Sequence, residues 1–452
     1  MENMENMENM DNAQSVQNMQ NMPVRRPNPR RRPPKKKKLN PKFLLTVGVV
    51  VALIVLFIIF AVGSVNRANE KREQARQESL AVESSIAQQR LEWEQEAQDL
   101  IRESEKYAAA CEFDKAIEVL DRFSGDPNEF NNLIICREKY EKAESQLVLW
   151  EDVTQVPFLS FSKLVDPETG FSGSKGEDNR YYYISTTEFT AILTQLYAND
   201  YMLVDMDDLF TTTKNDDGTT LIVKNALRLP EGKKPIVLIH CQPEGYENKL
   251  VLDAEGNIVS QVTPEEGNSY TGAYDFVPLL EDFIAKNPGF SFRGARAVLA
   301  VTGYKGLFGY ELTQTDSIIS IVNALKEKGY TLASNTYGNA RYGKMDILEL
   351  QDDLAKWENE VKPLLGETEI LAYARSSDIS DGKEAYTSKK YEKLYMAGFR
   401  YYMGICYNSS PWMNITDNTI RMGRLMVTGS NLKDKPALFA NLFDASAVYG
   451  EK

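Results

Sequence analysis

The residues best placed for chemistry stand at the end of one apolar strand. Pro235–Ile239 is a short β-branched run after a Pro/Gly/Lys turn, a pattern typical of a fully buried strand. His240, Cys241 and Gln242 follow it directly. In barrel and doubly wound α/β domains, the carboxyl ends of strands are where chemistry is usually placed. Histidine and cysteine side chains are suited to two kinds of site, a thiolate–imidazole pair and a metal centre.

His240 limits both kinds of site, because it is the only histidine among 452 residues. The sequence therefore excludes a centre with two histidine ligands and any Ser-His-Asp or Cys-His site not built on His240. Neighbouring residues in a strand point to opposite faces, so His240 and Cys241 are not expected to form a catalytic pair. We expect both to be packed strand residues, with Cys241 a buried structural thiol.

The stretch from Leu229 to Gln242 resembles the first signature of the polysaccharide deacetylase family (NodB homology, carbohydrate esterase family 4). That family has a Pro-Val-Val-Leu-(Thr/Ser)-Phe-Asp-Asp type strand after a Leu-Pro turn. Its first Asp is the general base, and its second Asp binds a divalent metal. In this chain the two positions are Cys241 and Gln242.

Further landmarks extend the resemblance over about residues 150–452. Where the family has two metal-binding histidines four residues apart, Ser334–Asn339 places Asn335 and Asn339 at the same spacing. Two more matching stretches are Glu369–Ile379 and Ala397–Gly404, the latter with Arg421–Arg424 after it. The resemblance implies an α/β fold, the distorted (β/α)-barrel of the NodB-homology type.

The same resemblance shows which chemistry is missing. Family members deacetylate polysaccharides with a divalent metal such as zinc, which activates water, and a carboxylate that takes the proton. Carboxamides carry no charge and are poor zinc ligands, so Asn335 and Asn339 do not replace two histidines. We therefore expect no metal or other cofactor and no catalytic residue, the degenerate positions being Cys241, Gln242, Asn335 and Asn339.

The favoured hypothesis is a catalytically inactive member that binds cell-envelope glycan or a partner protein. Candidate ligand contacts share a polar or aromatic character suited to sugars; they are Gln242, Asn335, Asn339, Tyr373, Arg375 and Trp412. Arg421 and Arg424 are expected to form structural salt bridges instead.

Two alternatives remain open at this point. One is an active metal-dependent deacetylase of envelope polysaccharide with relocated ligands, for which Asp205, Asp207 and Asp208 are the first carboxylates to consider. The other is an envelope assembly or sensor protein that acts through its helical stalk.

The elements that position these residues alternate between strands and helices from about Val156 onward, which predicts a parallel sheet or barrel. Ser185–Glu188 is a capping box that predicts a helix up to Tyr197. Lys249–Tyr274 contains an Asp-Ala-Glu-Gly turn between alternating runs and is predicted to be a β-hairpin insertion in the barrel domain, residues 151–452.

The N-terminal part predicts a different organisation. Residues 1–42 form a low-complexity leader, expected to be disordered, with ten Arg/Lys in residues 25–42. Phe43–Val65 is uncharged and long enough to span a membrane once; positive charge before it predicts a cytoplasmic N-terminus and an extracytoplasmic C-terminal domain. Residues 66–150 are predicted to be a solvated helical stalk, or a coiled coil that self-associates, and a tetratricopeptide-like helical hairpin that forms a neck.

Charge and cysteine content narrow the function classes further. From Asn66 onward the chain holds 42 basic and 61 acidic residues, which argues against nucleic-acid binding by this part. Four cysteines in a chain of this length do not form a disulfide scaffold. Whether Cys111 and Cys136 form a disulfide stays open.

Overall fold

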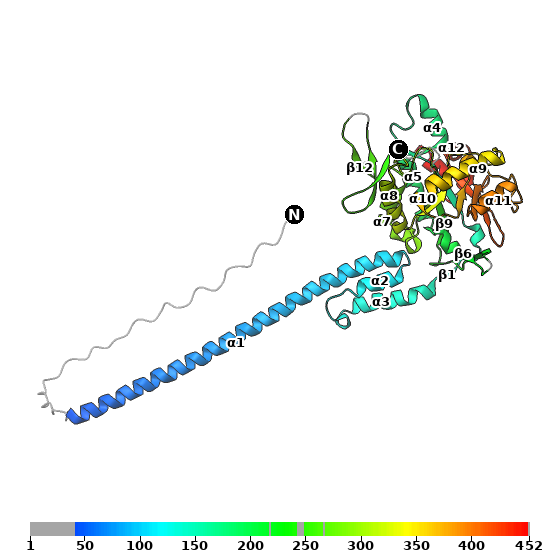
Figure 1. Ribbon diagram of the computed structural model, residues 1–452. Helices are drawn as coiled ribbons and strands as arrows, with labels where there is room; N and C mark the ends of the chain where they lie inside the picture. Colours follow the sequence, from blue (N-terminus) through cyan, green and yellow to red (C-terminus); the bar gives the residue numbers. More distant parts are fainter. Residues whose placement is uncertain (1–40, 217, 242–247, 265–266, 451–452) are drawn as a thin grey trace, which may run out of the picture. The chain divides into compact units, whose positions relative to one another are not determined.

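The computed structural model describes residues 41–450 apart from 217, 242–247 and 265–266 (Figure 1). The chain divides into two units, Met1–Ile86 and Ala87–Lys452. In the first unit the described residues belong to α1 (Pro41–Ala109), whose N-terminal part has a mean hydropathy of 3.2 in its most apolar window. By length and composition this helix can cross a membrane.

The second unit is built around a closed barrel of seven parallel strands, which confirms the predicted fold class. Each strand pairs in parallel with the next, and β18 returns to β2, so the barrel has no free edge. In barrel order the strands are β2 (Phe158–Phe161), β9 (Lys234–Cys241), β13 (Val298–Val301), β14 (Thr331–Ser334), β15 (Ile370–Ala372), β16 (Tyr401–Ile405) and β18 (Ile420–Val427). An eighth strand, β5 (Tyr201–Leu203), pairs with the first half of β9.

The period-two alternation of the strands separates two buried layers. Along β9, Val237, Ile239 and Cys241 belong to the cluster that fills the barrel, whereas Ile236 and Leu238 pack with the surrounding helices. His240 lies on the helix side, stacked on Phe276 of α7 with ring centroids 4.5 Å apart. Burial lowers the pKa of His240 to about 3, so its ring is neutral at physiological pH.

The predicted separation of His240 from Cys241 is therefore confirmed. The two side chains lie on opposite faces of β9 and do not form a thiolate–imidazole pair.

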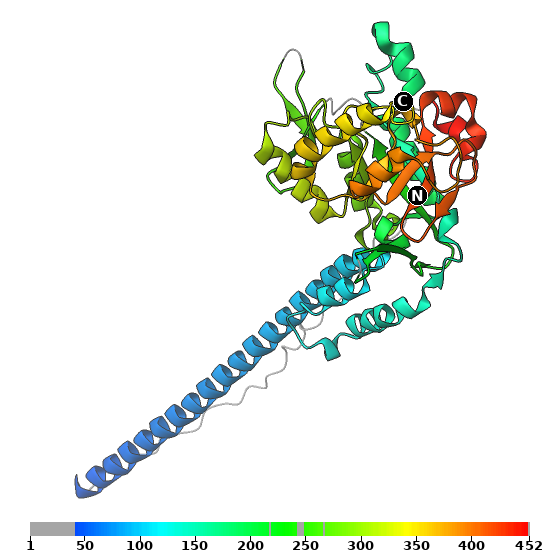
Figure 2. The same ribbon diagram turned by 45° about the vertical axis from the view of Figure 1, so that its right-hand side comes forward.

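Helices lie outside the strands in both views (Figures 1 and 2). Three of them begin with capping boxes, Ser185 with Glu188 at α5, as predicted, Asp205 with Asp208 at α6, and Asp346 with Glu349 at α9. The helices after the barrel's first strand are α4 (Gly176–Tyr182), α5 (Thr186–Ala198), α6 (Met206–Leu209), α7 (Phe276–Lys286), α8 (Thr315–Lys328), α9 (Ile347–Lys356), α10 (Lys362–Leu365), α11 (Lys389–Met396), α12 (Gly429–Asp434) and α13 (Ala445–Val448).

Four small sheets are separate from the barrel in the described part of the chain. The largest is a three-stranded antiparallel sheet between β9 and α7, formed by β10 (Lys249–Leu252), β11 (Ile258–Val262) and β12 (Tyr270–Gly272). Two-stranded pairs are β1 (Val148–Leu149) with β8 (Arg228–Leu229), β3 (Leu164–Val165) with β4 (Ile184–Ser185), and β6 (Phe210–Lys214) with β7 (Thr220–Lys224); β17 (Met413–Ile415) pairs with β18.

Within the second unit, the end of α1 packs with α2 (Phe113–Leu120) and α3 (Asn131–Ala143) around a small apolar cluster. Ser104 of α1 and Tyr140 of α3 share a buried hydrogen bond of 3.1 Å. Cys111 and Cys136 are both free thiols in this arrangement.

Candidate functional site at the barrel mouth

A cavity of about 510 Å³ opens at the carboxyl end of the barrel. Its walls bring together Cys241, Asn335, Asn339 and Arg375, four of the positions that the sequence singled out. Gln242 lies outside the described residues. The remaining two candidates, Tyr373 and Trp412, do not line this cavity.

At the floor of the cavity, Cys241 lies between a hydroxyl and a guanidinium. Its Sγ is 3.6 Å from Oγ of Ser160 on β2 and 3.4 Å from Nη1 of Arg424 on β18. Nη2 of Arg424 donates a 2.6 Å hydrogen bond to the carbonyl oxygen of Tyr373. The thiol therefore occupies the end of β9 with a cation beside it.

Arg424 is the main correction to the sequence-based expectation, which assigned it a structural salt bridge. It is 1% exposed, yet it has no ion pair with a carboxylate of the described residues. Its Nε also has no hydrogen-bond partner there. Leaving a buried cation without a counter-charge is costly, so this arrangement needs an explanation beyond stability.

The loop after β14 holds the two asparagines. Asn335 is buried and donates from Nδ2 to the carbonyl oxygen of Ala372 at 2.7 Å, while Oδ1 of Asn339 is buried without a partner in the described part of the chain. Asp353 of α9 fixes the loop by accepting hydrogen bonds from the amides of Tyr337 and Gly338 at 2.9 and 2.8 Å.

Backbone strain concentrates at this mouth. Thr336, Asn339, Arg375 and Ser376 all adopt positive φ angles, between 51° and 66°. Such a conformation is costly for any residue with a side chain, and most of all for a β-branched one. Strain of this kind persists where surrounding contacts enforce it, and it is frequent at binding sites.

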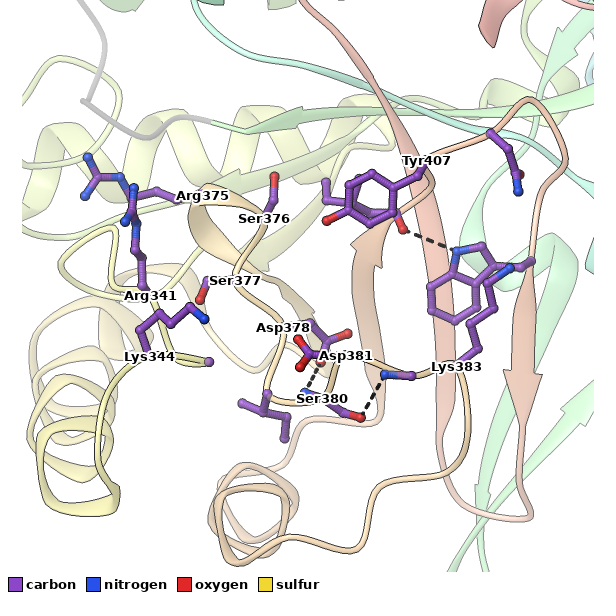
Figure 3. Close-up of a pocket in the computed structure, with 16 residues that line it drawn as sticks. Arg341, Lys344, Arg375, Ser376, Ser377, Asp378, Ser380, Asp381, Lys383 and Tyr407 are labelled. Atoms are coloured by element: carbon purple, nitrogen blue, oxygen red, sulfur yellow. Dashed lines mark hydrogen bonds between the residues drawn. The ribbon is translucent and has the colours of Figure 1, made fainter.

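Arg375 and Arg341 extend the site outward. Both are exposed, and both also line a neighbouring cavity of about 590 Å³. Figure 3 shows their side chains on one side of that cavity, with Tyr407 on the other side. The two cavities thus share one cationic wall.

A closed ion-pair centre lies beside the neighbouring cavity, which its Asp378 lines. Arg421 is 2% exposed, and its Nη2 lies 3.1 Å from Oδ2 of Asp378. Its guanidinium also contacts the carbonyl oxygens of Gly382 and Glu384 and lies 3.8 Å above the ring of Tyr386. The expected structural salt bridge of Arg421 is confirmed.

The two remaining candidates belong to these surroundings. Tyr373 is fully buried and stacks with Tyr402 at a centroid distance of 6.3 Å. Trp412 lines the neighbouring cavity, where Lys383 Nζ lies 5.5 Å from its ring centroid.

The three aspartates considered as relocated ligands lie at the other end of the barrel. They follow β5, whose last residue pairs with Ile236, five positions before Cys241, which corresponds to about 17 Å along the strand. Oδ1 of Asp205 accepts a hydrogen bond from the amide of Arg296, just before β13 begins. Burial and the neighbouring Asp208 raise the pKa of Asp205 to about 7. Asp205, Asp207 and Asp208 therefore do not converge beside Cys241.

The described donor set does not fit the divalent metal that the family resemblance implies. The described lining offers two thiols, Cys241 and Cys406, and three carboxamides, and a guanidinium hydrogen-bonds to the sulfur of Cys241. A second cation next to that sulfur is electrostatically unfavourable, and zinc prefers thiolate, imidazole and carboxylate ligands. Among the described residues no group of three or more His, Cys, Asp or Glu side chains is placed to bind a metal ion.

Several lining residues were not anticipated from the sequence. Tyr181 and Tyr182 of α4 and Tyr407 after β16 are exposed at the rim, and Arg341 and Lys435 add positive charge. The run of three tyrosines at positions 181–183 was the available signal for the rim. For Arg424 the signal was its register, because it shares a strand face with the interior residues Ile420 and Met422.

No protein-family model matches the sequence, and no curated protein sequence matches it. The fold is similar to that of solved polysaccharide deacetylases. The deacetylase PplD of Streptococcus pyogenes, solved in complex with acetate, is 10% identical over 64% of this chain and 98% of its own, with a TM-score of 0.35. BC0361, a polysaccharide deacetylase from Bacillus cereus, is 12% identical over 62% of this chain and 68% of its own, also with a TM-score of 0.35. Identities and TM-scores this low give no information on the chemistry of the site, which follows from the residues of this chain alone.

Proposed function

We propose that this protein is a membrane-anchored, extracytoplasmic glycan-binding protein that does not deacetylate its ligand. The observation that supports this function best is the composition of the mouth. It combines hydrogen-bonding amides, hydroxyls and guanidinium groups with exposed aromatic rings around one cavity of about 510 Å³. A carboxylate that could act as general base is absent from the described lining.

The tyrosines at the rim favour a sugar over other ligands. Tyr181 and Tyr182 are each 56% exposed, with ring centroids 4.9 Å apart, and Tyr407 is 79% exposed. Flat aromatic faces bury the apolar faces of pyranose rings, while their hydroxyls reach polar groups below. Asn339, whose buried oxygen has no partner in the described part of the chain, is the polar group best prepared to accept such a hydroxyl hydrogen bond.

The anchor is proposed from the first unit. Its apolar helix is long enough to cross a membrane, and the basic leader before it favours a cytoplasmic N-terminus. The acidic balance from Asn66 onward is compatible with an envelope location and not with a nucleic-acid ligand.

The test is a titration of the detergent-purified full chain with chitooligosaccharides and peptidoglycan fragments, with acetate release measured in the same samples. We expect binding without acetate release. Tyr181→Ala together with Tyr182→Ala should weaken binding about tenfold, because truncating an aromatic contact residue typically costs more than 1 kcal/mol.

Tyr270 and Tyr274 provide a matched control pair. They are 49% and 43% exposed, their ring centroids are 5.4 Å apart, and they do not line the mouth. Replacing both with alanine should leave binding unchanged. Metal-dependent acetate release, or flat titrations with every glycan, would contradict the proposed function.

A further inference from the structure

The charge of the mouth differs from the charge of the chain around it. Four cationic residues line the cavity, Arg341, Arg375, Arg424 and Lys435, and its described lining contains no Asp or Glu. From Asn66 onward, in contrast, the chain has 19 more acidic than basic residues. Positive charge gathered in a cleft of an acidic protein focuses the electrostatic potential there.

None of these four cations has a counter-ion among the described residues. Three other arginines of the barrel domain do. Arg180 pairs with Glu188 at 2.6 Å, Arg296 pairs with Glu281 at 2.6 Å, and Arg421 pairs with Asp378. The half-buried Arg400 has no ion pair among the described residues and donates to the carbonyl oxygens of Tyr395 and Phe399 instead. Arg424, which is 1% exposed, is the most deeply buried of these arginines.

The geometry of Arg424 leaves it ready for a ligand. Two of its nitrogens are held by Cys241 and Tyr373, while Nε, like that of Arg421, is buried without a partner among the described residues. Arg375 lines the same cavity, and its backbone is strained, with φ of 51°. A guanidinium fixed in this way is preorganised for hydrogen bonds to a planar or tetrahedral oxyanion.

Resting on the proposed function, we infer that the ligand is an acidic glycan, whose carboxylate or phosphate oxygens bind to Arg424 and Arg375 at the barrel mouth. The inferred oxyanion supplies the counter-charge that Arg424 lacks among the described residues. The sugar ring next to the oxyanion then reaches Tyr181 and Tyr182 at the rim of the same cavity. The positions that resemble a metal centre thus form a site organised around a guanidinium.

The test compares three oligosaccharides of similar length on the detergent-purified full chain. One is a neutral N-acetylglucosamine oligomer, one carries carboxylates, and one carries phosphate diesters. We expect at least one acidic oligomer to bind about tenfold or more tightly than the neutral one, with an advantage that shrinks as salt concentration rises. The preferred acidic arm identifies the source of the oxyanion.

Variants of the two arginines test whether the preference for acidic oligomers arises at the barrel mouth. Arg375→Met, at an exposed position, should fold normally and weaken acidic binding about 10- to 100-fold, with a smaller change for the neutral oligomer. Arg424→Lys keeps the charge but loses the fork of donors, and it should also weaken acidic binding. Lys433→Met removes one charge from an exposed site of α12 outside the cavity, and it should change nothing.

The outcomes separate this inference from the proposed function. Equal binding of neutral and acidic oligomers, or an acidic preference that survives Arg375→Met and Arg424→Lys, would overturn the inference and leave glycan binding standing. Absence of binding by all three oligomers would overturn both.

Discussion

Two arginines three residues apart on β18 lie in opposite environments. Arg421 faces away from the barrel interior and is enclosed by Asp378, two backbone carbonyls and Tyr386. Arg424 faces the barrel interior, beside a thiol, and has no carboxylate partner among the described residues. Nε of both arginines lacks a hydrogen-bond partner there, so the difference between them is the carboxylate. The first region shows how this fold neutralises a buried cation. The second shows a buried cation at a cavity without a carboxylate partner in the described structure, the arrangement on which the proposed binding site is based.

Stability measurements on variants of the two arginines test whether their structural roles differ. Arg421→Met leaves Asp378 without its buried partner and removes the bonds to Gly382 and Glu384, so we expect a loss of about 3–5 kcal/mol. Arg424→Met removes an uncompensated cation and should cost less than about 1 kcal/mol or stabilise the protein. Urea unfolding of the full chain in detergent measures both. Equal losses would mean that Arg424 is also a structural residue.

The amino end of the barrel contains buried acidic groups, Asp205 and Asp208, in contrast to the buried cation Arg424 at the mouth. Burial and Asp208 raise the pKa of Asp205 from 3.8 to about 7, so the folded state binds its proton more tightly than the unfolded state. The stabilising effect of that proton is complete below pH 4 and is lost as the pH rises through about 7.

We therefore expect wild-type stability to fall by roughly 2–4 kcal/mol more than that of Asp205→Asn between pH 4 and pH 8. Thermal unfolding as a function of pH checks this difference. Parallel pH profiles of the two proteins would show that folding does not raise the pKa of Asp205.

A smaller effect is expected from loosening the loop that holds Asn335 and Asn339 at the mouth. Asp353 accepts hydrogen bonds from the loop amides of Tyr337 and Gly338 and from the hydroxyl of Tyr342. Asp353→Asn places an NH₂ group among these donors and should cost about 1–3 kcal/mol, with weaker glycan binding as the loop of Asn335 and Asn339 loosens.

Asp346, which caps the same helix, gives the matched control. Asparagine is as good as aspartate at this position, so Asp346→Asn should be nearly neutral for stability and binding. A loss of binding in this control equal to that of Asp353→Asn would point to a general effect of α9 instead of the loop.

The sequence predicted the fold well because helix starts and strand faces are set by residues that are close together in the sequence. The capping box of Ser185 and Glu188 sets the start of α5 from four residues, and the alternation of β9 places His240 and Cys241 on opposite faces. The helix and strand alternation, together with the signature strand, was sufficient for the barrel class.

The site was predictable only in part, because its decisive contacts join distant segments. Arg424 contacts Cys241 across 183 positions of sequence, and nothing near Arg424 indicates that it lacks a carboxylate. The aspartates after β5 were misplaced as candidates because β5 pairs with the first half of β9, a register that no local pattern reveals. Tyr373 is likewise removed from the cavity by packing against Tyr402.

The central claim, that a guanidinium and not a metal organises the mouth, is tested most directly by zinc retention. The detergent-purified full chain is exposed to zinc and desalted, and its metal content is compared with that of Cys241→Ser treated identically. We expect the same residual zinc in both proteins, because Arg424 hydrogen-bonds to the sulfur of Cys241 and the described lining adds only Cys406 as a further strong ligand. Stoichiometric zinc in the wild type that is lost in Cys241→Ser would contradict it and make the deacetylase alternative the leading hypothesis.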